Sequence, residues 1–209
     1  MVALLSNRLD YSPRYRLLEA ATRMFAERGF NAVSMRQLGR AVGLQAGSLY
    51  AHIESKEELL QELIEEGFEQ LVESTRDRLY YTSLPEKRVS VFVQHHLEFQ
   101  RTHPDWHFLA QIEIRYLPRE RTHEILRLQQ AYCSLLEESL RSLSKGGQAL
   151  MKPELVQQAL CFLNGVSCLG NVSSYELNFT DWGDNLSQII VKTCLSSSCG
   201  QAQFNPPLF

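Results

Sequence analysis

Apolar residues recur every three or four positions along most of this 209-residue chain, which is the spacing of one face of an α-helix. The pattern predicts helices over 13–28, 34–43, 44–53, 56–80, 86–102, 106–116, 119–144, 153–172 and 181–197. No stretch of useful length alternates apolar and polar residues as a β-strand does. The predicted fold class is therefore all-α.

Residues 56–80 are expected to form one uninterrupted helix that links two domains. At about 1.5 Å per residue this helix spans nearly 40 Å, enough to join an N-terminal domain to a separate body. We place a three-helix domain at 1–55 and a helical body at 56–199. The tail 200–209 contains Gly, Asn and two prolines, and it is assigned no regular structure.

The segment 34–53 has the features of two short helices joined by a tight turn. Ser34 and Gln37 have the spacing of a capping box, in which each side chain satisfies a backbone N–H at a helix start. Gly43 supplies the left-handed residue that ends the first helix. This pattern indicates a helix-turn-helix, whose second helix enters the major groove of DNA. A helical hairpin inside an ordinary all-α domain is the alternative interpretation.

The net charge of −3 conceals an uneven distribution. Residues 1–56 carry eight Lys or Arg and four Asp or Glu, a net charge of +4, whereas the remainder carries −7. A basic head on an acidic body is typical of a protein that touches nucleic-acid phosphates with one end.

Composition favours a cytoplasmic protein with no membrane contact. No apolar run reaches the ~20 residues that a membrane-spanning helix needs. The N-terminus is too short and too weakly apolar for a signal peptide. The five cysteines are scattered and odd in number, so reduced thiols are expected. A redox sensor is the alternative, with Cys194 and Cys199 as its candidate pair.

Residues 17–34, continued through 56–60, resemble the DNA-binding domain of the tetracycline-repressor (TetR) family. The matching residues are Ala20, Phe25, Gly29, Phe30, Ser34, Leu38, Ala41, Gly43, Gly47, Leu49, Tyr50, Lys56 and Leu59. Beyond the first 60 residues or so, the likeness lies only in the helical organisation. The resemblance implies a transcriptional regulator, not an enzyme, with a C-terminal domain for ligand binding and dimerisation.

The side chains expected to contact a DNA operator lie on the helix-turn-helix and its flank. They are Ser34, Arg36, Gln45, Ala46, Gly47, Ser48, Tyr50, His52 and Lys56. Amide and hydroxyl groups such as those of Gln45 and Ser48 can bond base edges or phosphates. The resemblance implies phosphate contacts for Tyr50, His52 and Lys56. Gln45 and Ala46 depart from the residues common in the family, so the base preference does not follow from it.

A homodimer is expected, because one helix-turn-helix makes too small an interface for tight specific binding. The eighth and ninth predicted helices, 153–172 and 181–197, carry the expected interface. The eighth presents small residues that let helices approach closely, among apolar residues on more than one side. A monomeric core would explain the same pattern, and the dimer contact is what the resemblance implies.

Aromatic, apolar and basic residues of the body are candidates for an effector pocket. They are Phe92, His96, Phe99, Phe108, Ile112, Arg115, Tyr116, Arg127, Tyr132 and Phe162. In one continuous helix, Phe108, Ile112 and Arg115 would form an apolar stripe ending in a cation that could hold a carboxylate or phosphate. The segment 116–132 is similar to TetR relatives that sense acyl-coenzyme A (acyl-CoA) thioesters. An amphipathic ligand such as an acyl-CoA or fatty-acid derivative is therefore predicted; plain core packing is the alternative.

No cofactor or metal is expected. His103 and His107 have the spacing of one helical face, but Pro104 places His103 outside the helix that follows, and no further ligands complete a site. No motif supplies the nucleophile, base or metal of an all-α enzyme. A regulator of efflux or stress genes that senses another hydrophobic compound, or a purely structural interaction protein, remains an alternative.

Overall fold

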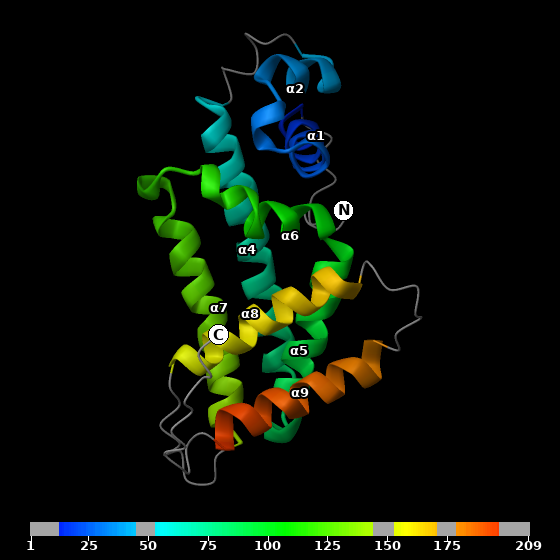
Figure 1. Cartoon of the computed structure of the whole chain (residues 1–209), viewed down its shortest axis with the longest axis vertical. Coiled ribbons are helices and arrows are strands. Elements are labelled where there is room, and N and C mark those ends of the chain that lie inside the picture. Colours follow the sequence, from blue (N-terminus) through cyan, green and yellow to red (C-terminus); the bar gives the residue numbers. More distant parts are fainter. Residues whose placement is uncertain (1–12, 45–52, 144–152, 171–178, 197–209) are drawn as a thin grey trace, which may run out of the picture. The chain divides into compact units, whose positions relative to one another are not determined.

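A computed structural model of the chain describes residues 13–44, 53–143, 153–170 and 179–196 (Figure 1). Every regular element in these ranges is helical, as the sequence predicted. The α-helices are α1 (Pro13–Arg28), α2 (Met35–Val42), α4 (Lys56–Tyr80), α5 (Pro85–Thr102), α6 (Pro104–Gln111), α7 (His123–Arg141), α8 (Pro153–Gly170) and α9 (Phe179–Ser196). Three short 3-10 helices are η1 (Phe30–Ala32), η2 (Glu113–Tyr116) and η3 (Arg119–Arg121). None of the described helices is long and apolar enough to cross a membrane.

The predicted bounds of two helices, 106–116 and 119–144, were wrong when compared with α6 and α7. α6 begins at Pro104, whose missing N–H costs nothing in the first turn of a helix, and it ends at Gln111. The expected helix over 106–116 therefore breaks at Ile112, and η2 follows. α7 begins at His123 instead of 119, because the extended Pro118 leads first into η3.

The chain forms two compact units. Unit 1 comprises Met1–Ser74 and Phe99–Ala131, and unit 2 comprises Thr75–Glu98 and Tyr132–Phe209. Helices α4, α5 and α7 each contribute residues to both units. This division differs from the expected domains at 1–55 and 56–199, which remain a prediction.

The core of unit 1 joins α1, α2, α4 and α6. Within unit 1, the largest fully buried side chains of these four helices are Leu17, Phe25, Leu38, Leu59, Leu60, Ile64 and Leu109. The indole of Trp106 packs edge-on against the rings of Phe68 and Phe99, at centroid distances of 5.1 and 5.5 Å. The indole nitrogen also donates to the carbonyl oxygen of Ile64 at 3.3 Å. This contact ties α6 to the backbone of α4.

In unit 2, polar contacts fix α9 against α5. The carboxylate of Asp184 accepts hydrogen bonds from the hydroxyl of Ser90 and the amide of Gln94, at 2.5 and 2.9 Å. Gly183 lies beside Gln94, so close that a β-carbon there would come within 2.9 Å of the Gln94 side chain. Leu136, Leu140 and Leu163 are fully buried in the same unit.

Candidate nucleic-acid interface

The first helix of the predicted helix-turn-helix forms as its sequence dictates. The hydroxyl of Ser34 accepts from the backbone N–H of Gln37 at 3.3 Å, and the Gln37 side chain accepts from the N–H of Ser34 at 2.7 Å. Gly43 ends α2 in the left-handed conformation, with φ 74° and ψ 22°. Both the capping box and the glycine stop are thus confirmed.

α2 buries one face and exposes the other. Met35 and Leu38 are buried, whereas Arg36, Gln37 and Arg40 are exposed. Ser34 and Arg36 are therefore accessible, as a contact with DNA phosphates requires. Six of the expected contact residues, Gln45, Ala46, Gly47, Ser48, Tyr50 and His52, lie outside the described residues.

Lys56 makes contacts within the protein that the sequence did not predict. Its ammonium nitrogen donates to the carbonyl oxygens of Phe30 and Val33, at 2.9 and 3.0 Å. The same nitrogen lies 4.1 Å from the centroid of the Phe30 ring, a cation–π distance. The lysine therefore connects the first residue of α4 to the segment that leads into α2.

Glu113 is a buried carboxylate that the sequence analysis missed. It is 3 % exposed, and one of its oxygens accepts from the backbone N–H of Phe30 at 3.0 Å. Tyr116, a candidate effector contact, stacks on the Phe30 ring at a centroid distance of 5.4 Å. No capping or charge pattern around 113 could have revealed this partner, because it lies 83 positions away in the chain.

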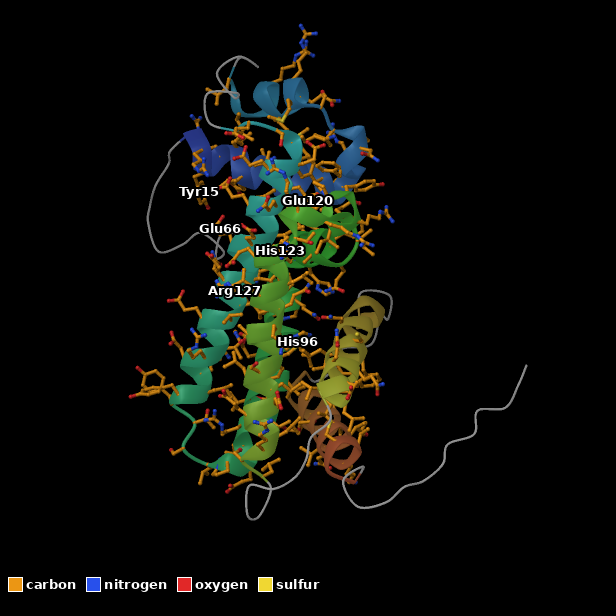
Figure 2. All side chains as sticks on the ribbon, turned by 90° about the vertical axis from the view of Figure 1, so that its left-hand side faces the viewer. Tyr15, Glu66, His96, Glu120, His123 and Arg127 are labelled. Atoms are coloured by element: carbon orange, nitrogen blue, oxygen red, sulfur yellow. The ribbon has the colours of Figure 1, made fainter. Side chains whose placement is uncertain are left out.

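Three of the candidate effector residues come together in unit 2. The rings of Phe92 and Tyr132 lie 4.9 Å apart, and the Nδ1 of His96 is 2.9 Å from the Tyr132 hydroxyl. All three are buried, and the Tyr132 hydroxyl also hydrogen-bonds the buried Thr75. Burial raises the pKa of the Tyr132 phenol, and the bond to Thr75 opposes this only in part. The cluster is a small polar centre in an apolar core (His96 is labelled in Figure 2).

The remaining candidates do not join that cluster. Phe99 packs on His103 and Trp106 in unit 1, while Phe108, Ile112 and Arg115 are exposed. The expected helical stripe through these last three was wrong, because α6 ends before Ile112. Arg127, labelled in Figure 2, is exposed and paired with Glu124, which lowers the pKa of that carboxyl. Phe162 is 47 % exposed on α8.

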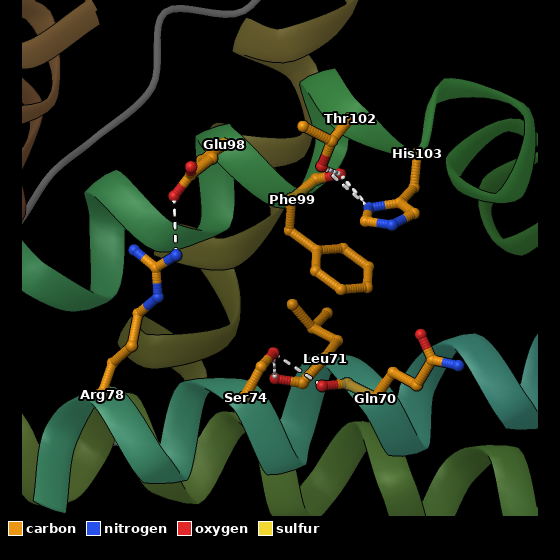
Figure 3. Close-up of polar contacts among 8 residues, drawn as sticks. All are labelled: Gln70, Leu71, Ser74, Arg78, Glu98, Phe99, Thr102 and His103. Atoms are coloured by element: carbon orange, nitrogen blue, oxygen red, sulfur yellow. Dashed lines mark hydrogen bonds and ion pairs between the residues drawn. The ribbon is translucent and has the colours of Figure 1, made fainter. Parts of the chain in front are cut away.

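His103 is held by the backbone. Its Nδ1 donates to the carbonyl oxygen of Phe99 at 2.9 Å, next to the Thr102 hydroxyl (Figure 3). Burial lowers the pKa of both His103 and His107, which favours neutral rings. Among the residues that the structure describes, no three His, Cys, Asp or Glu side chains are grouped as metal ligands would be.

The cysteine pair proposed as a redox sensor is only partly described. Cys194 is buried, and burial raises the pKa of its thiol, which disfavours the reactive thiolate. Cys199 lies outside the described residues.

Comparison with known proteins identifies the helix-turn-helix region. Residues 17–63 match the family described as bacterial regulatory proteins, tetR family. Over these residues the chain is similar to the DNA-binding domain of that family. The matched residues take in most of α1, all of α2 and the start of α4.

One similar protein is the HTH-type transcriptional repressor KstR2 of Mycobacterium tuberculosis (strain ATCC 25618 / H37Rv). It is 41% identical over 78 residues, which are 37% of this chain and 39% of KstR2. The match thus spans about two fifths of the length of this relative. The structure of this ketosteroid transcriptional regulator superposes with a TM-score of 0.68 and 25% identity, over 88% of this chain and 96% of that one.

The likeness extends further along a second relative, the fatty acid metabolism regulator protein of Bacillus subtilis (strain 168). It is 20% identical over 137 residues, which are 65% of this chain and 71% of the regulator. The structure of FadR from B. subtilis in complex with stearoyl-CoA gives a TM-score of 0.71 at 14% identity, over 85% of this chain and 97% of that one. AibR, in complex with isovaleryl coenzyme A and operator DNA, gives 0.67 at 20% identity, over 88% and 98%. At these identities the two structures show a shared fold.

Proposed function

We propose that this chain is a ligand-responsive transcriptional repressor that binds a palindromic DNA operator as a homodimer and acts in the cytoplasm. The observation that carries the proposal is the tetR-family match at 17–63, supported by the capped α2 and its left-handed glycine stop. A small amphipathic effector would bind the body and release the operator.

In this proposal the exposed side of the helix-turn-helix makes the DNA contacts. Arg36 on α2 would neutralise a phosphate, and the segment 45–52 would supply the base-reading and remaining phosphate contacts. A reader of this kind loses affinity as salt rises, because each neutralised phosphate releases condensed counterions.

Two exposed apolar side chains support a dimer through α8 and α9. Phe162 and Ile189 are 47 % and 51 % exposed, although both helices bury leucine or isoleucine side chains within unit 2. Gly165, three residues beyond Phe162, has no neighbouring atom within 4 Å of a β-carbon built on it. A second copy of the chain would cover these residues and give the two-fold symmetry that a palindrome requires.

The proposed effector is an acyl-CoA or another fatty-acid derivative. The relative that matches over the longer stretch of this chain is a fatty acid regulator, whereas the KstR2 sequence match is confined to 78 residues. The Phe92–His96–Tyr132 cluster would meet the ligand's polar group inside the apolar body.

A steroid-derived effector is the second candidate, favoured by the 25% identity shared with the KstR2 structure across nearly its whole length. A thermal-shift titration with acyl-CoAs of increasing chain length and with a steroid carboxylate separates the two. A ligand that binds the native state raises the melting temperature in proportion to RT ln(1 + [L]/Kd). Stabilisation by acyl-CoAs alone supports the first candidate, and no shift across all chain lengths rejects it. Release of upstream DNA by the same compound tests the repressor switch.

A further inference from the structure

We propose that Lys56 and Glu113 are positioning residues for DNA binding: together they hold the backbone of Phe30 and so fix α2 against α4. The inference rests on the proposed DNA-binding function. It assigns Lys56 a role inside the protein, in place of the phosphate contact that its position in the motif implies.

A lysine is unexpected at the first position of a helix, because the partial positive charge of the helix N-terminus repels a cation. Lys56 is the first residue of α4, and Ser55 caps that helix by accepting from the N–H of Glu58 at 3.0 Å. The ammonium group instead turns to the carbonyl oxygens of Phe30 and Val33 and to the Phe30 ring. Two carbonyls and an aromatic face are acceptors that match the three N–H donors of a lysine.

Glu113 acts on the other side of the same residue. Its carboxylate accepts the N–H of Phe30, while the Lys56 ammonium donates to the C=O of Phe30. The negatively charged carboxylate thus faces the N–H donor of Phe30, and the positively charged ammonium faces its carbonyl acceptor. Hydrogen bonds to charged groups are shorter and stronger than neutral ones, and Glu113 is buried, where water competes little.

The Phe30 side chain is fixed as firmly as its backbone. Its ring meets Phe25 edge-on at 5.2 Å and stacks on Tyr116 at 5.4 Å, and it is 2 % exposed. Gly29 precedes it with φ 84° and ψ 146°, a conformation open essentially to glycine alone, so the chain turns sharply at this point. Phe30 is therefore an anchor at the exit of α1.

The anchor determines where the helix-turn-helix begins. Lys56 also holds the carbonyl of Val33, the residue directly before the Ser34 cap of α2. From Phe30 to Ser34 there are only four steps of chain, so a shift of Phe30 moves the start of α2. The segment 113–116 and the first residue of α4 both contact Phe30. A conformational change in residues 104–116 would therefore move Phe30 and, with it, the start of α2.

The salt dependence of DNA binding distinguishes a positioning lysine from a phosphate contact. We would titrate a labelled duplex from upstream of the gene with wild type, Lys56→Met, Arg36→Met and Lys87→Met over a series of salt concentrations. Loss of a phosphate contact reduces the slope of log K against log salt by about 0.9. Exposed Lys87, in the first turn of α5 in unit 2, controls for removal of one charge at a distance.

We expect Lys56→Met to bind roughly tenfold more weakly with an unchanged slope, as the loss of charged hydrogen bonds inside the protein predicts. Arg36→Met should lose about one phosphate contact from the slope, and Lys87→Met should match wild type. If Lys56→Met lowers the slope as Arg36→Met does, Lys56 is a phosphate contact and the inference fails. If wild type itself shows no salt-dependent binding, the proposed function fails instead.

Glu113 supplies a second, independent test. Glu113→Gln keeps an oxygen that can accept the Phe30 N–H and should bind DNA within about threefold of wild type, whereas Glu113→Leu should lose roughly tenfold. Amide hydrogen exchange reads the anchor without DNA: the Phe30 N–H should exchange faster in Glu113→Leu, with circular dichroism confirming a folded chain. Unchanged exchange at Phe30 and unchanged affinity in a folded Glu113→Leu variant would overturn the role of Glu113.

Discussion

The indole ring of Trp106 lies directly on the backbone of Gly67, so that a β-carbon at residue 67 would fall 1.9 Å from the indole nitrogen. The ring atoms Cδ1 and Cε2 are also only 2.3 Å from that position. This close approach is what allows α6 to cross α4 in unit 1, with the indole N–H reaching the carbonyl oxygen of Ile64.

Gly67→Ala is expected to destabilise the protein even though alanine is the better helix former. The added methyl group would displace the Trp106 ring, and overpacking of this kind costs about 1 to 3 kcal/mol, more than the ~1 kcal/mol gained in helix propensity. Chemical denaturation followed by tryptophan fluorescence measures the change. Glu73→Ala, at an exposed position on the same helix, is the control and should leave the stability nearly unchanged. Equal stability of the two variants would contradict the packing described here.

Tyr132→Phe should weaken the core of unit 2 by about 1 to 2 kcal/mol, because it leaves the buried His96 and Thr75 without the hydroxyl that they share. Tyr81→Phe is the control, since Tyr81 is 82 % exposed. Urea denaturation gives both values. If the hydroxyl also contacts the effector, the affinity for acyl-CoA should fall by more than the loss of stability explains. A Tyr132→Phe variant as stable as Tyr81→Phe would show that the hydrogen bonds of the Tyr132 hydroxyl do not stabilise unit 2.

Glu66 makes stability depend on pH near neutrality. Burial, and then the nearby Glu62 and Glu69, raise the pKa of Glu66 from 4.5 to about 7. Because the folded-state pKa exceeds the unfolded value, the native state binds the proton more tightly, and stability falls as pH rises from about 4.5 through 7. Glu66→Gln should therefore raise the melting temperature at pH values above 7 and change little near the unfolded pKa.

The control for this experiment is Glu73→Gln, an exposed position on the same helix. It should leave the dependence of melting temperature on pH as in wild type. If the melting temperature of Glu66→Gln changes with pH as that of wild type does, the pKa of Glu66 is not raised in the folded protein.

Ile189→Asp and Phe162→Asp should dissociate the proposed dimer. A charge placed in the centre of an apolar interface is desolvated without a partner, which costs several kcal/mol of association. Sedimentation equilibrium measures the oligomeric state. Leu126→Asp, at a position 56 % exposed on α7 in unit 1, is the control and should remain dimeric. If both Phe162→Asp and Ile189→Asp keep the molecular mass of the wild-type dimer, the dimer contact lies elsewhere.

Periodicity and capping residues predicted most of the fold. The apolar stripes predicted the bounds of two helices correctly. α1 runs from Pro13 to Arg28, and α4 runs from Lys56 to Tyr80. The break at Ile112 was missed because no glycine or proline marks it; η2 instead ends with Tyr116 stacked on the distant Phe30. Local sequence carries no information about a partner brought near only by tertiary packing.

The same limit applies to the candidate sites. Phe92, His96 and Tyr132 were chosen for their chemistry, and they do meet because they share the inner faces of α5 and α7. Lys56 was identified by its place in the motif, but its internal acceptors depend on how the exit of α1 folds back onto α4. Glu113 gave no signal, since a buried carboxylate is recognised only once its N–H donor is known.

Binding of DNA by a dimer of this chain is tested most directly by fluorescence anisotropy on a duplex from upstream of its own gene. We expect two chains to bind each duplex, binding to be tighter than to a shuffled duplex, and log K to fall linearly with log salt by about 0.9 per phosphate contact. Equal affinity for the two duplexes, or an affinity indifferent to salt, would contradict it.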